Sequence, residues 1–256
     1  MAVGYLDRYQ FAYRQPLHRQ VHFMTRVLCL FVFSSFSLTA VHADDSAPKK
    51  LKGLPLQFTE DFSRGADSWK TTDSSAWELQ QDGDDQVFAL TKKKSNYEPP
   101  HRSPYNRAIL KDQEFSDVIL DVQLQSTSPD YDHRSLCLFF NYVDESHFYY
   151  VHFGKKTDAH ANQIFIVNDA PRVAISTKTT PGTNWDDQWH HARVVRKVSS
   201  GTIEIYFDDM NQPVMTANDE TFKSGRVGIG SFDDPGRFDD IRIYGKKVKG
   251  EATSGE

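Results

Sequence analysis

Cysteine is almost absent from this sequence, which has two cysteines, Cys29 and Cys137, among its 256 residues. A fold held together by disulfides is therefore excluded. Cys29 lies in a predicted leader, so Cys137, inside the apolar run SLCLFFNYV, is expected to be a buried thiol in a strand. Hydrophobic residues make up 38% of the chain and aromatic residues 13%, enough to bury the core on which stability must depend.

Long amphipathic helices are also absent, because from about residue 56 onward the apolar residues recur with period two rather than 3.6. In DVILDVQLQ (117–125), Val and Leu at even positions alternate with Asp121, Gln123 and Gln125. This is typical of a half-buried antiparallel strand. Similar runs are SLCLFFNYV, HFYYVHF, NQIFIVN, RVAIST, WHHARVVRKV, TIEIYFD, RVGIGSF, DDIRIYG, LQFTEDF, AWELQ and QVFALTK. About twelve short strands separated by turn signals predict an all-β sandwich or barrel.

No apolar run is long enough to be a convincing membrane span. Residues 24–43 instead contain one basic residue, the apolar run VLCLFVF, and the small residues Val41 and Ala43 before DDSAPKK. That order predicts a secretory signal peptide cleaved after Ala43, and therefore a secreted or periplasmic protein. Residues 1–23 have no clear periodicity in front of Met24, so translation is expected to begin at Met24, a genuine long leader being the alternative.

Basic charge is in deficit once the leader is removed. Without residues 1–43 the chain has 26 basic and 34 acidic residues, a net charge of −8. An acidic exported chain argues against nucleic acid and against anionic lipid as partners.

A single domain is expected over residues 56–245, since no repeat or linker interrupts that stretch. Residues 44–55 are expected to be a flexible linker and residues 246–256 a disordered tail, because both carry lysine, serine and glycine. Residues 92–105, KKKSNYEPPHRSPY, form the longest segment without strand character. A loop of that length in a compact β domain is either functional or mobile, and whether it fills a face of the sandwich is open.

Three segments resemble a known superfamily. WDDQWHHARVVRKVSSGTIEIYFDDMNQPV (185–214) resembles the middle of laminin-G-like domains, where a Trp-His-His strand precedes a short turn and an Asp-tipped strand. SGRVGIGSFDDPGRFDDIRIYG (224–245) resembles the closing strands of the concanavalin A-like lectin/glucanase superfamily, and FTEDFSRGADSW (58–69) its opening strand. The resemblance implies a jelly-roll sandwich of two antiparallel sheets, one of them concave. It does not fix an activity, because this fold carries lectins, carbohydrate-binding modules, glycosidases, lyases and protein-binding modules.

The Glu-x-Asp-x-Glu triplet of the retaining glucanases with this fold is missing. The strand TIEIYFDD offers Glu204 and Asp208 on one face, but four residues of strand separate them by about 13 Å. That distance is too large for the carboxylate pair of either a retaining or an inverting glycosidase.

A lyase would need a base such as His or Tyr and a cation that neutralises the substrate carboxylate. His147 and Tyr149 share one face of HFYYVHF, and with His133 and Arg134 of YDHRS they form the candidate catalytic group. The alternative is structural, because aromatic strands suit sheets. The Gln-Ile-His motif of alginate lyases with this fold is absent, since Phe165 follows Gln-Ile here.

Arg134, His147 and Tyr149 are also the candidate ligand-binding residues, together with Trp185, which is predicted near a strand end where it could stack on a sugar ring. Trp189 is expected in the core. His190 and His191 are adjacent in a strand and point to opposite faces, so they cannot easily share a metal ion.

Four carboxylates surround the last predicted strand, in SFDDPGRFDDIRIYG (231–245). Asp233 and Asp234 are expected in a turn. Alternation places Asp239 on the core side with the isoleucines of the strand, and Asp240 on the outside.

Glucanases with this fold often bind a structural calcium ion where the first and last strands meet. By position, the resemblance implies Asp239 as a ligand, with Glu60 or Asp61 opposite. Calcium takes about six to eight oxygen ligands, which strand-end aspartates and backbone carbonyls supply. The alternative is that Asp239 accepts hydrogen bonds from backbone N–H groups.

The sequence therefore predicts an exported carbohydrate-binding module without catalysis of its own. One alternative is a polysaccharide-degrading enzyme, a lyase or an unusual glycosidase. Another is a protein-binding adhesion module of laminin-G type.

Overall fold

The computed structural model describes residues 47–248. The predicted signal peptide (24–43), the residues before it and residues 249–256 lie outside the described residues. Over residues 47–248 the chain forms two antiparallel sheets and no α-helix, with two short 3₁₀ turns at Ser74–Ala76 and Val198–Ser200. No helix in this range is long and apolar enough to cross a membrane.

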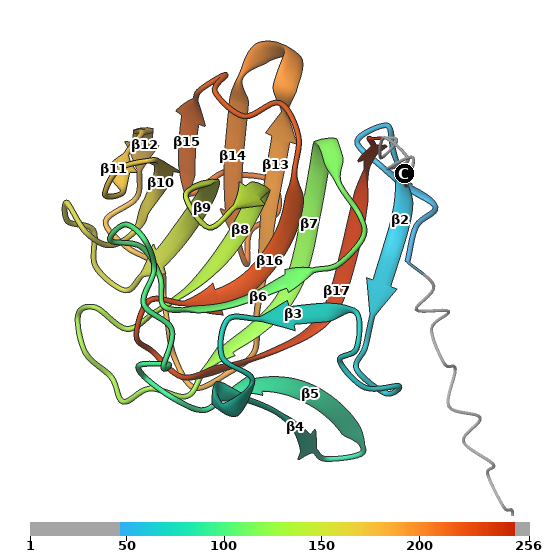
Figure 1. Ribbon diagram of the computed structural model, residues 1–256, viewed down its shortest axis with the longest axis vertical. Coiled ribbons are helices and arrows are strands. Elements are labelled where there is room, and N and C mark those ends of the chain that lie inside the picture. Colours follow the sequence, from blue (N-terminus) through green and yellow to red (C-terminus); the bar gives the residue numbers. More distant parts are fainter. Residues whose placement is uncertain (1–46, 249–256) are drawn as a thin grey trace, which may run out of the picture. The chain divides into compact units, whose positions relative to one another are not determined.

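Ten strands of the described chain form one sheet (Figure 1). They are β1 (Lys50–Leu51), β2 (Leu54–Glu60), β4 (Trp77–Asp82), β5 (Asp85–Leu90), β7 (Phe115–Ser126), β12 (Ser176–Thr179), β13 (His190–Lys197), β14 (Thr202–Phe207), β15 (Met215–Asn218) and β17 (Gly236–Lys247). Neighbours follow the order β1-β2-β17-β7-β13-β14-β15-β12, and the β4–β5 hairpin joins the first part of β17.

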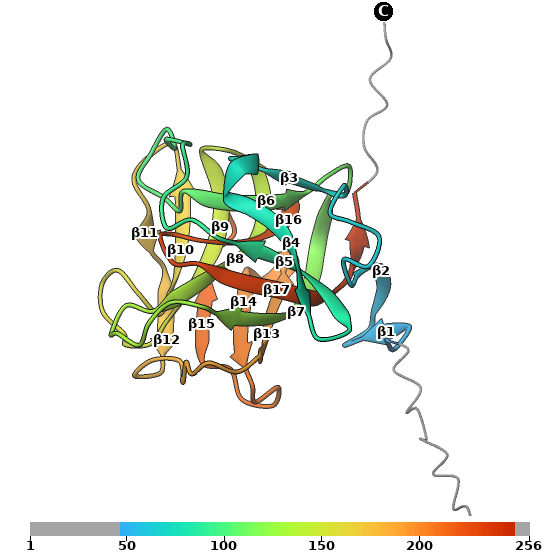
Figure 2. The same cartoon turned by 90° about the horizontal axis from the view of Figure 1, so that it is seen from below.

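Seven further strands of the described chain form the second sheet. They are β3 (Trp69–Thr71), β6 (Asn106–Leu110), β8 (Ser135–Asp144), β9 (His147–Gly154), β10 (Gln163–Asn168), β11 (Val173–Ala174) and β16 (Arg226–Ser231). Their order is β11-β10-β9-β8-β16-β6-β3. In Figure 2, β3, β6 and β16 lie above β17, β7 and β13, so the two sheets are stacked as layers.

The hydrophobic core lies between these layers, as the period-two pattern requires. Leu120 of β7 and Val194 of β13 enter it from one sheet, and Val151 of β9 and Ile229 of β16 enter it from the other, all fully buried. The predicted fold class is confirmed: the protein is an all-β jelly-roll sandwich of two antiparallel sheets.

The described sheet extends past both ends of the predicted domain, 56–245. β1 and the start of β2 lie inside residues 44–55, which were predicted to be a flexible linker, and β17 continues to Lys247. Leu51 and Leu54 pack against an apolar cluster on the ten-stranded sheet. Burial of these leucines orders a stretch whose lysine and glycine content favoured a linker.

A bulge in β17 changes the predicted facing of its aspartates. Phe238 and Ile243 both point into the core, but between them β17 has four residues where β7, the neighbouring strand, has three. Asp240 takes the left-handed backbone conformation, with φ of 46°. The prediction that Asp239 faces the core is therefore wrong, because the inserted residue places it opposite Gln123 on the outer face of the sheet.

Asp234 is a buried acceptor, not a simple turn residue. Its carboxylate accepts hydrogen bonds from the hydroxyls of Ser128 and Tyr131 at 2.7 Å each, and from the backbone N–H of Ser135 at 2.9 Å. Its neighbour Asp233 is exposed. Asp234 therefore fastens the segment before β8 to the segment before β17.

Candidate functional site

The outer face of the seven-stranded sheet, turned away from the ten-stranded sheet, is apolar and buried. Because these strands are apolar on both faces, the outer face must also be covered. Residues 91–105, called the covering loop below, cross part of it. Cys137 lies here as a buried free thiol in β8, as predicted. The apolar cluster on this face consists of Ile109, Cys137, Phe139, Tyr142, Phe148, Tyr150, Phe165 and Val167.

Aromatic and guanidinium contacts hold the covering loop on this face. The ring of Tyr105 meets Phe232 edge-on with 5.2 Å between centroids, and Phe232 stacks on His152 of β9. The backbone N–H of Arg172 donates to the carbonyl of Arg102 at 3.1 Å, and the Arg172 guanidinium lies 4.5 Å from the Phe232 centroid. The loop thus covers a part of this face.

Arg107 of β6 is the cation beneath the covering loop. It is fully buried, and its guanidinium carbon lies 5.0 Å from the ring centroid of Tyr97, 5.9 Å from that of Tyr142 and 4.9 Å from that of Phe148. It also donates to the hydroxyl oxygens of Tyr97 at 3.2 Å and Tyr142 at 3.4 Å. Each phenol oxygen accepts from Arg107, so each O–H is free to donate elsewhere.

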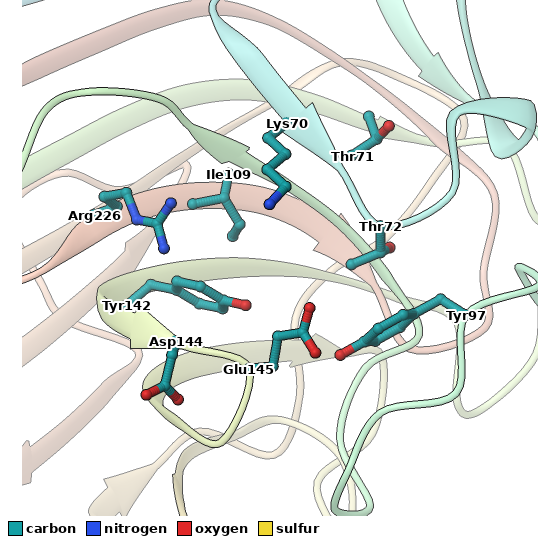
Figure 3. A pocket seen from close by; sticks show the side chains of 9 residues that line it. All are labelled: Lys70, Thr71, Thr72, Tyr97, Ile109, Tyr142, Asp144, Glu145 and Arg226. Atoms are coloured by element: carbon teal, nitrogen blue, oxygen red, sulfur yellow. The ribbon is translucent and has the colours of Figure 1, made fainter.

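A pocket of about 290 Å³ remains open beside the covering loop (Figure 3). Figure 3 shows the Lys70 ammonium and the Glu145 carboxylate directed into the same space, with the hydroxyls of Tyr97 and Tyr142 approaching it from opposite sides. Asp144 points away from it. The full lining is Lys70, Thr71, Thr72, Tyr97, Ile109, Tyr142, Asp144, Glu145 and Arg226.

Burial raises the pKa of both phenols in this pocket, so both remain neutral hydroxyls. For Tyr97, Arg107 opposes the effect of burial and Glu145 reinforces it, and for Tyr142, Arg107 again opposes it. Arg226 lies 5.3 Å from the Tyr142 centroid, and its Nε has no hydrogen-bond partner among the described residues. The pocket therefore combines aromatic surface with neutral hydroxyls, cationic donors and a carboxylate, a set suited to a ligand rich in hydroxyl groups.

His147 and Tyr149 share a face of β9, as alternation requires, but Tyr149 points into the core between the sheets. The Tyr149 hydroxyl donates to Asp219 and accepts from the backbone N–H of Phe222 at 3.0 Å. Burial raises the pKa of Tyr149 to about 12, so it is neither a base nor an accessible ligand. The His147 Nδ1 lies 2.8 Å from the Asp144 carboxylate, which raises the pKa of the imidazole.

His133 and Arg134 lie at the opposite end of the β8–β9 hairpin from His147. Seven residue steps along β9 separate His147 from Gly154, whose partner in β8 directly follows Arg134, a span of roughly 23 Å. Arg134 is buried and donates to Asp187 at 2.9 Å. His133 is exposed. The predicted four-residue catalytic group is therefore not formed.

Trp185 and Trp189, which flank Asp186 and Asp187, have roles opposite to those predicted. Trp185 is 2% exposed, and its Nε1 donates to the carbonyl of Phe153 at 2.9 Å, so it belongs to the core and cannot stack on a sugar. Trp189, expected in the core, is half-buried beside the ten-stranded sheet, where its Nε1 donates to Asp82 at 3.0 Å.

The three predicted calcium ligands do not gather in one place. Both carboxylate oxygens of Glu60 are engaged, one by a backbone N–H and the other by the Trp69 indole, each at 3.3 Å. Asp61 is exposed and accepts hydrogen bonds within its own turn, and Asp239 points outward at the bulge. Within residues 47–248 no three His, Cys, Asp or Glu side chains are placed to hold a metal ion, so the residues do not fit the implied site.

The pocket is built mainly from residues that the sequence did not single out. The order of the seven-stranded sheet is not the order of the chain, so β3, β6, β16 and β8 bring together side chains up to 156 positions apart in sequence. The length of the proline-rich loop was the one signal in the sequence, and it marked the segment that contains Tyr97 without singling out that residue. The unpredicted residues that now define the pocket are Lys70, Tyr97, Tyr142, Glu145 and Arg226.

Comparison with known proteins supports the fold. No family model and no curated protein matches the chain. Among solved structures, the cellulose induced protein Cip1 matches with a TM-score of 0.50 at 11% identity, covering 75% of this chain and 99% of that one. The carbohydrate binding module CBM66 from Bacillus subtilis matches with a TM-score of 0.49 at 15% identity, covering 69% of this chain and 95% of that one. Domain 4 of AbnA, a GH43 extracellular arabinanase from Geobacillus stearothermophilus in complex with arabinotriose, matches with a TM-score of 0.49 at 10% identity, covering 75% and 93%.

Identities this low speak to the fold alone, since one jelly roll carries many activities. The laminin-G part of the predicted resemblance stays a prediction.

Proposed function

We propose that this protein binds carbohydrate in the pocket beside the covering loop and performs no chemistry there. The observation that supports the proposal most is the position of the covering loop. It lies on the outer face of the seven-stranded sheet and leaves a pocket, rather than a long groove, beside it. A pocket of about 290 Å³ is suited to one end of a glycan chain rather than to its interior.

The lining supports this choice of ligand. The rings of Tyr97 and Tyr142 offer surface on which a sugar ring packs. Lys70 and Arg226 can donate to ring hydroxyl oxygens, and Glu145 can accept from them.

The protonation states give catalysis no support. A general acid needs a carboxyl group with a raised pKa, and a phenol base needs a lowered one. The pKa of Asp144 is lowered, mainly by hydrogen bonds from Ser146 and His147 that outweigh its burial, and burial raises the pKa of both phenols. Asp144 and the two phenols therefore give the lyase and glycosidase alternatives no acid or base.

The adhesion alternative lacks a surface among residues 47–248. A protein-binding face needs a contiguous apolar centre. The exposed large apolar side chains instead come singly from separate segments: Leu79, Tyr131, Val143, Val173 and Val248. Export rests on the predicted signal peptide and is part of the proposal.

A glycan array probed with the purified protein, followed by titration calorimetry on the hits, tests the proposal. Binding to glycans with a shared terminal sugar is expected, weakened about tenfold or more in Lys70→Ala and Glu145→Gln, because each removes a charged hydrogen-bonding group. Lys111→Ala, an exposed lysine outside the pocket, is the matched control. Silence on every glycan would reject carbohydrate binding, and new reducing ends or unsaturated products on a polysaccharide panel would reject the absence of catalysis.

A further inference from the structure

A second cavity, of about 350 Å³, lies on the outer face of the ten-stranded sheet, on the other side of the core from the glycan pocket. It is called the acidic pocket below. Its position follows from the β17 bulge, which turns the Asp239 side chain toward it, and from Trp189, which precedes β13. The lining is Asp82, Asp85, Val87, Gln123, Trp189, Asp239 and Asp240, and four of these seven residues are aspartates.

Asp239 is the feature that points to a ligand. Its side chain is 7% exposed, and its Oδ1 is buried without a hydrogen-bond partner among the described residues. A buried carboxylate oxygen is costly unless a donor or a cation meets it. Burial, reinforced by the nearby carboxylates of Asp85, Asp240 and Asp61, raises the pKa of Asp239 to about 7.

Two basic residues approach aspartates at the rim of the acidic pocket. Arg237 approaches Asp82 at 3.6 Å, and Arg242 approaches Asp240 at 3.9 Å. Both contacts are long and partly exposed, so they contribute little. The pocket therefore attracts a positively charged group.

The size of that group follows from the spacing of the carboxylates. Four aspartates line the pocket, yet no three acidic side chains of residues 47–248 are close enough together to hold one metal ion. A ligand that meets several of them has to carry more than one hydrogen-bond donor, as an ammonium group together with hydroxyl groups does. The Trp189 indole adds a flat apolar wall, which an ammonium group alone would leave unused.

We propose that the acidic pocket binds a protonated amino sugar, whose ammonium group donates to Asp239 and the neighbouring carboxylates while its ring packs on Trp189. Gln123, with both a donor and an acceptor, is placed to meet the ring hydroxyls. An extended lysine side chain fits less well, because it brings the charge without a ring for the indole. The proposal is independent of the glycan pocket on the opposite sheet and survives if that pocket proves empty.

Titration calorimetry of the purified protein with glucosamine, N-acetylglucosamine and glucose tests the charge requirement. The three sugars share a ring and differ at one substituent. Glucosamine is expected to bind at least about tenfold more tightly than the other two, as a hydrogen-bonded charge would confer. At pH 7 its binding should release protons, because a bound cation lowers the pKa of Asp239, and the measured heat should then depend on the buffer.

Variants locate the site. Asp239→Asn should weaken glucosamine binding about tenfold and abolish proton release, and Trp189→Ala should weaken it several-fold. Asp85→Asn replaces an exposed lining residue and should also weaken glucosamine binding, so it tests the site even if Asp239→Asn does not fold. Asp84→Asn, an exposed neighbour outside the lining, is the matched control and should bind as the parent does.

Three results would overturn the proposal. Equal binding of glucosamine and N-acetylglucosamine would show that the charge is not recognised. Binding of calcium chloride alone, lost in Asp239→Asn while glucosamine does not bind, would make this a metal site. Binding of lysine amide in preference to glucosamine would assign the pocket to a basic peptide.

Discussion

The outer face of the seven-stranded sheet is apolar and closed by a loop, whereas the outer face of the ten-stranded sheet is mixed in polarity and left partly open. On the first face, the covering loop and Arg107 bury an aromatic cluster and leave a pocket with both cationic and acidic groups at its rim. On the second face, the β1–β2 hairpin covers a smaller apolar cluster, and the bulge in β17 directs the Asp239 side chain into the acidic pocket. A loop builds one pocket and a strand irregularity builds the other.

The largest loss of stability is expected at Asp234, which joins the segment before β8 to the segment before β17. Asp234→Ala should lower the free energy of unfolding by roughly 3–5 kcal/mol, because it leaves the buried donors of Ser128 and Ser135 and the partly exposed hydroxyl of Tyr131 without their acceptor. Asp233→Ala, its exposed neighbour, should change it by less than about 0.5 kcal/mol. Urea unfolding of both variants measures the difference, and equal losses would contradict the role given to Asp234.

The second-largest loss of stability is expected at Arg107, and it tests whether Arg107 holds the covering loop on the sheet. Arg107→Met should cost about 2–3 kcal/mol, because the guanidinium packs on three rings and donates to two phenols. It should also free the covering loop, read as faster proteolysis within residues 91–105 and loss of glycan binding. Arg102→Met, an exposed arginine of the same loop, is the control. An unchanged cleavage rate in Arg107→Met would show that the loop is held without Arg107.

A pH titration distinguishes the second face. The raised pKa of Asp239, about 7, means that the folded protein keeps a proton that the unfolded chain releases near pH 4. Stability from this group is therefore complete below about pH 4 and is lost as the pH rises to about 7. Asp239→Asn should flatten that part of the profile and be about 1–2 kcal/mol more stable than the parent at pH 8, where the parent buries an unpaired charge.

Melting of the same pair with calcium and with a chelator tests the calcium prediction. Because the carboxylates do not converge, we expect no shift of the midpoint in either protein. If calcium raised the melting midpoint of the parent but not that of Asp239→Asn, the calcium prediction would hold after all. The stability of the calcium-bound parent would then rise with pH instead of falling, since a bound cation keeps the carboxylate charged.

The sequence predicts the fold class well because, in half-buried strands such as β7 and β14, the alternation of apolar and polar residues shows which side chains face the core. It misses β6, where all five residues are buried and NRAIL shows no alternation, and β3, which has three residues. It also misassigns Asp239, because a period-two pattern carries no mark of the position at which a bulge inserts a residue.

The candidate site could be predicted only in part. Lys70 and Arg226 meet Tyr142 through a strand order that a single sequence does not reveal, and each is an ordinary charged residue in its own segment. The length of the proline-rich loop marked it as either functional or mobile, but not which face of the sandwich it covers. The roles of Trp185 and Trp189 were exchanged because both belong to a loop, where alternation says nothing about burial.

The smallest effect concerns the backbone of the bulge. Asp240 holds φ at 46°, a conformation that costs most residues about 1 kcal/mol and aspartate somewhat less. Asp240→Gly relieves that strain but adds freedom to the unfolded chain, so a change of only about 0.5 kcal/mol is expected, whereas the β-branched Asp240→Val should be clearly destabilising. If the bulge is what turns Asp239 outward, Asp240→Gly should keep glucosamine binding within a few-fold, because the glycine preserves the inserted residue. Deletion of residue 240 restores plain alternation with Phe238 still opposite Leu124, so Asp239 stays opposite Gln123 and glucosamine binding should again fall by no more than a few-fold. Loss of binding in a folded deletion variant but not in Asp240→Gly would show that the local twist of the bulge, and not the facing of Asp239 alone, shapes the acidic pocket.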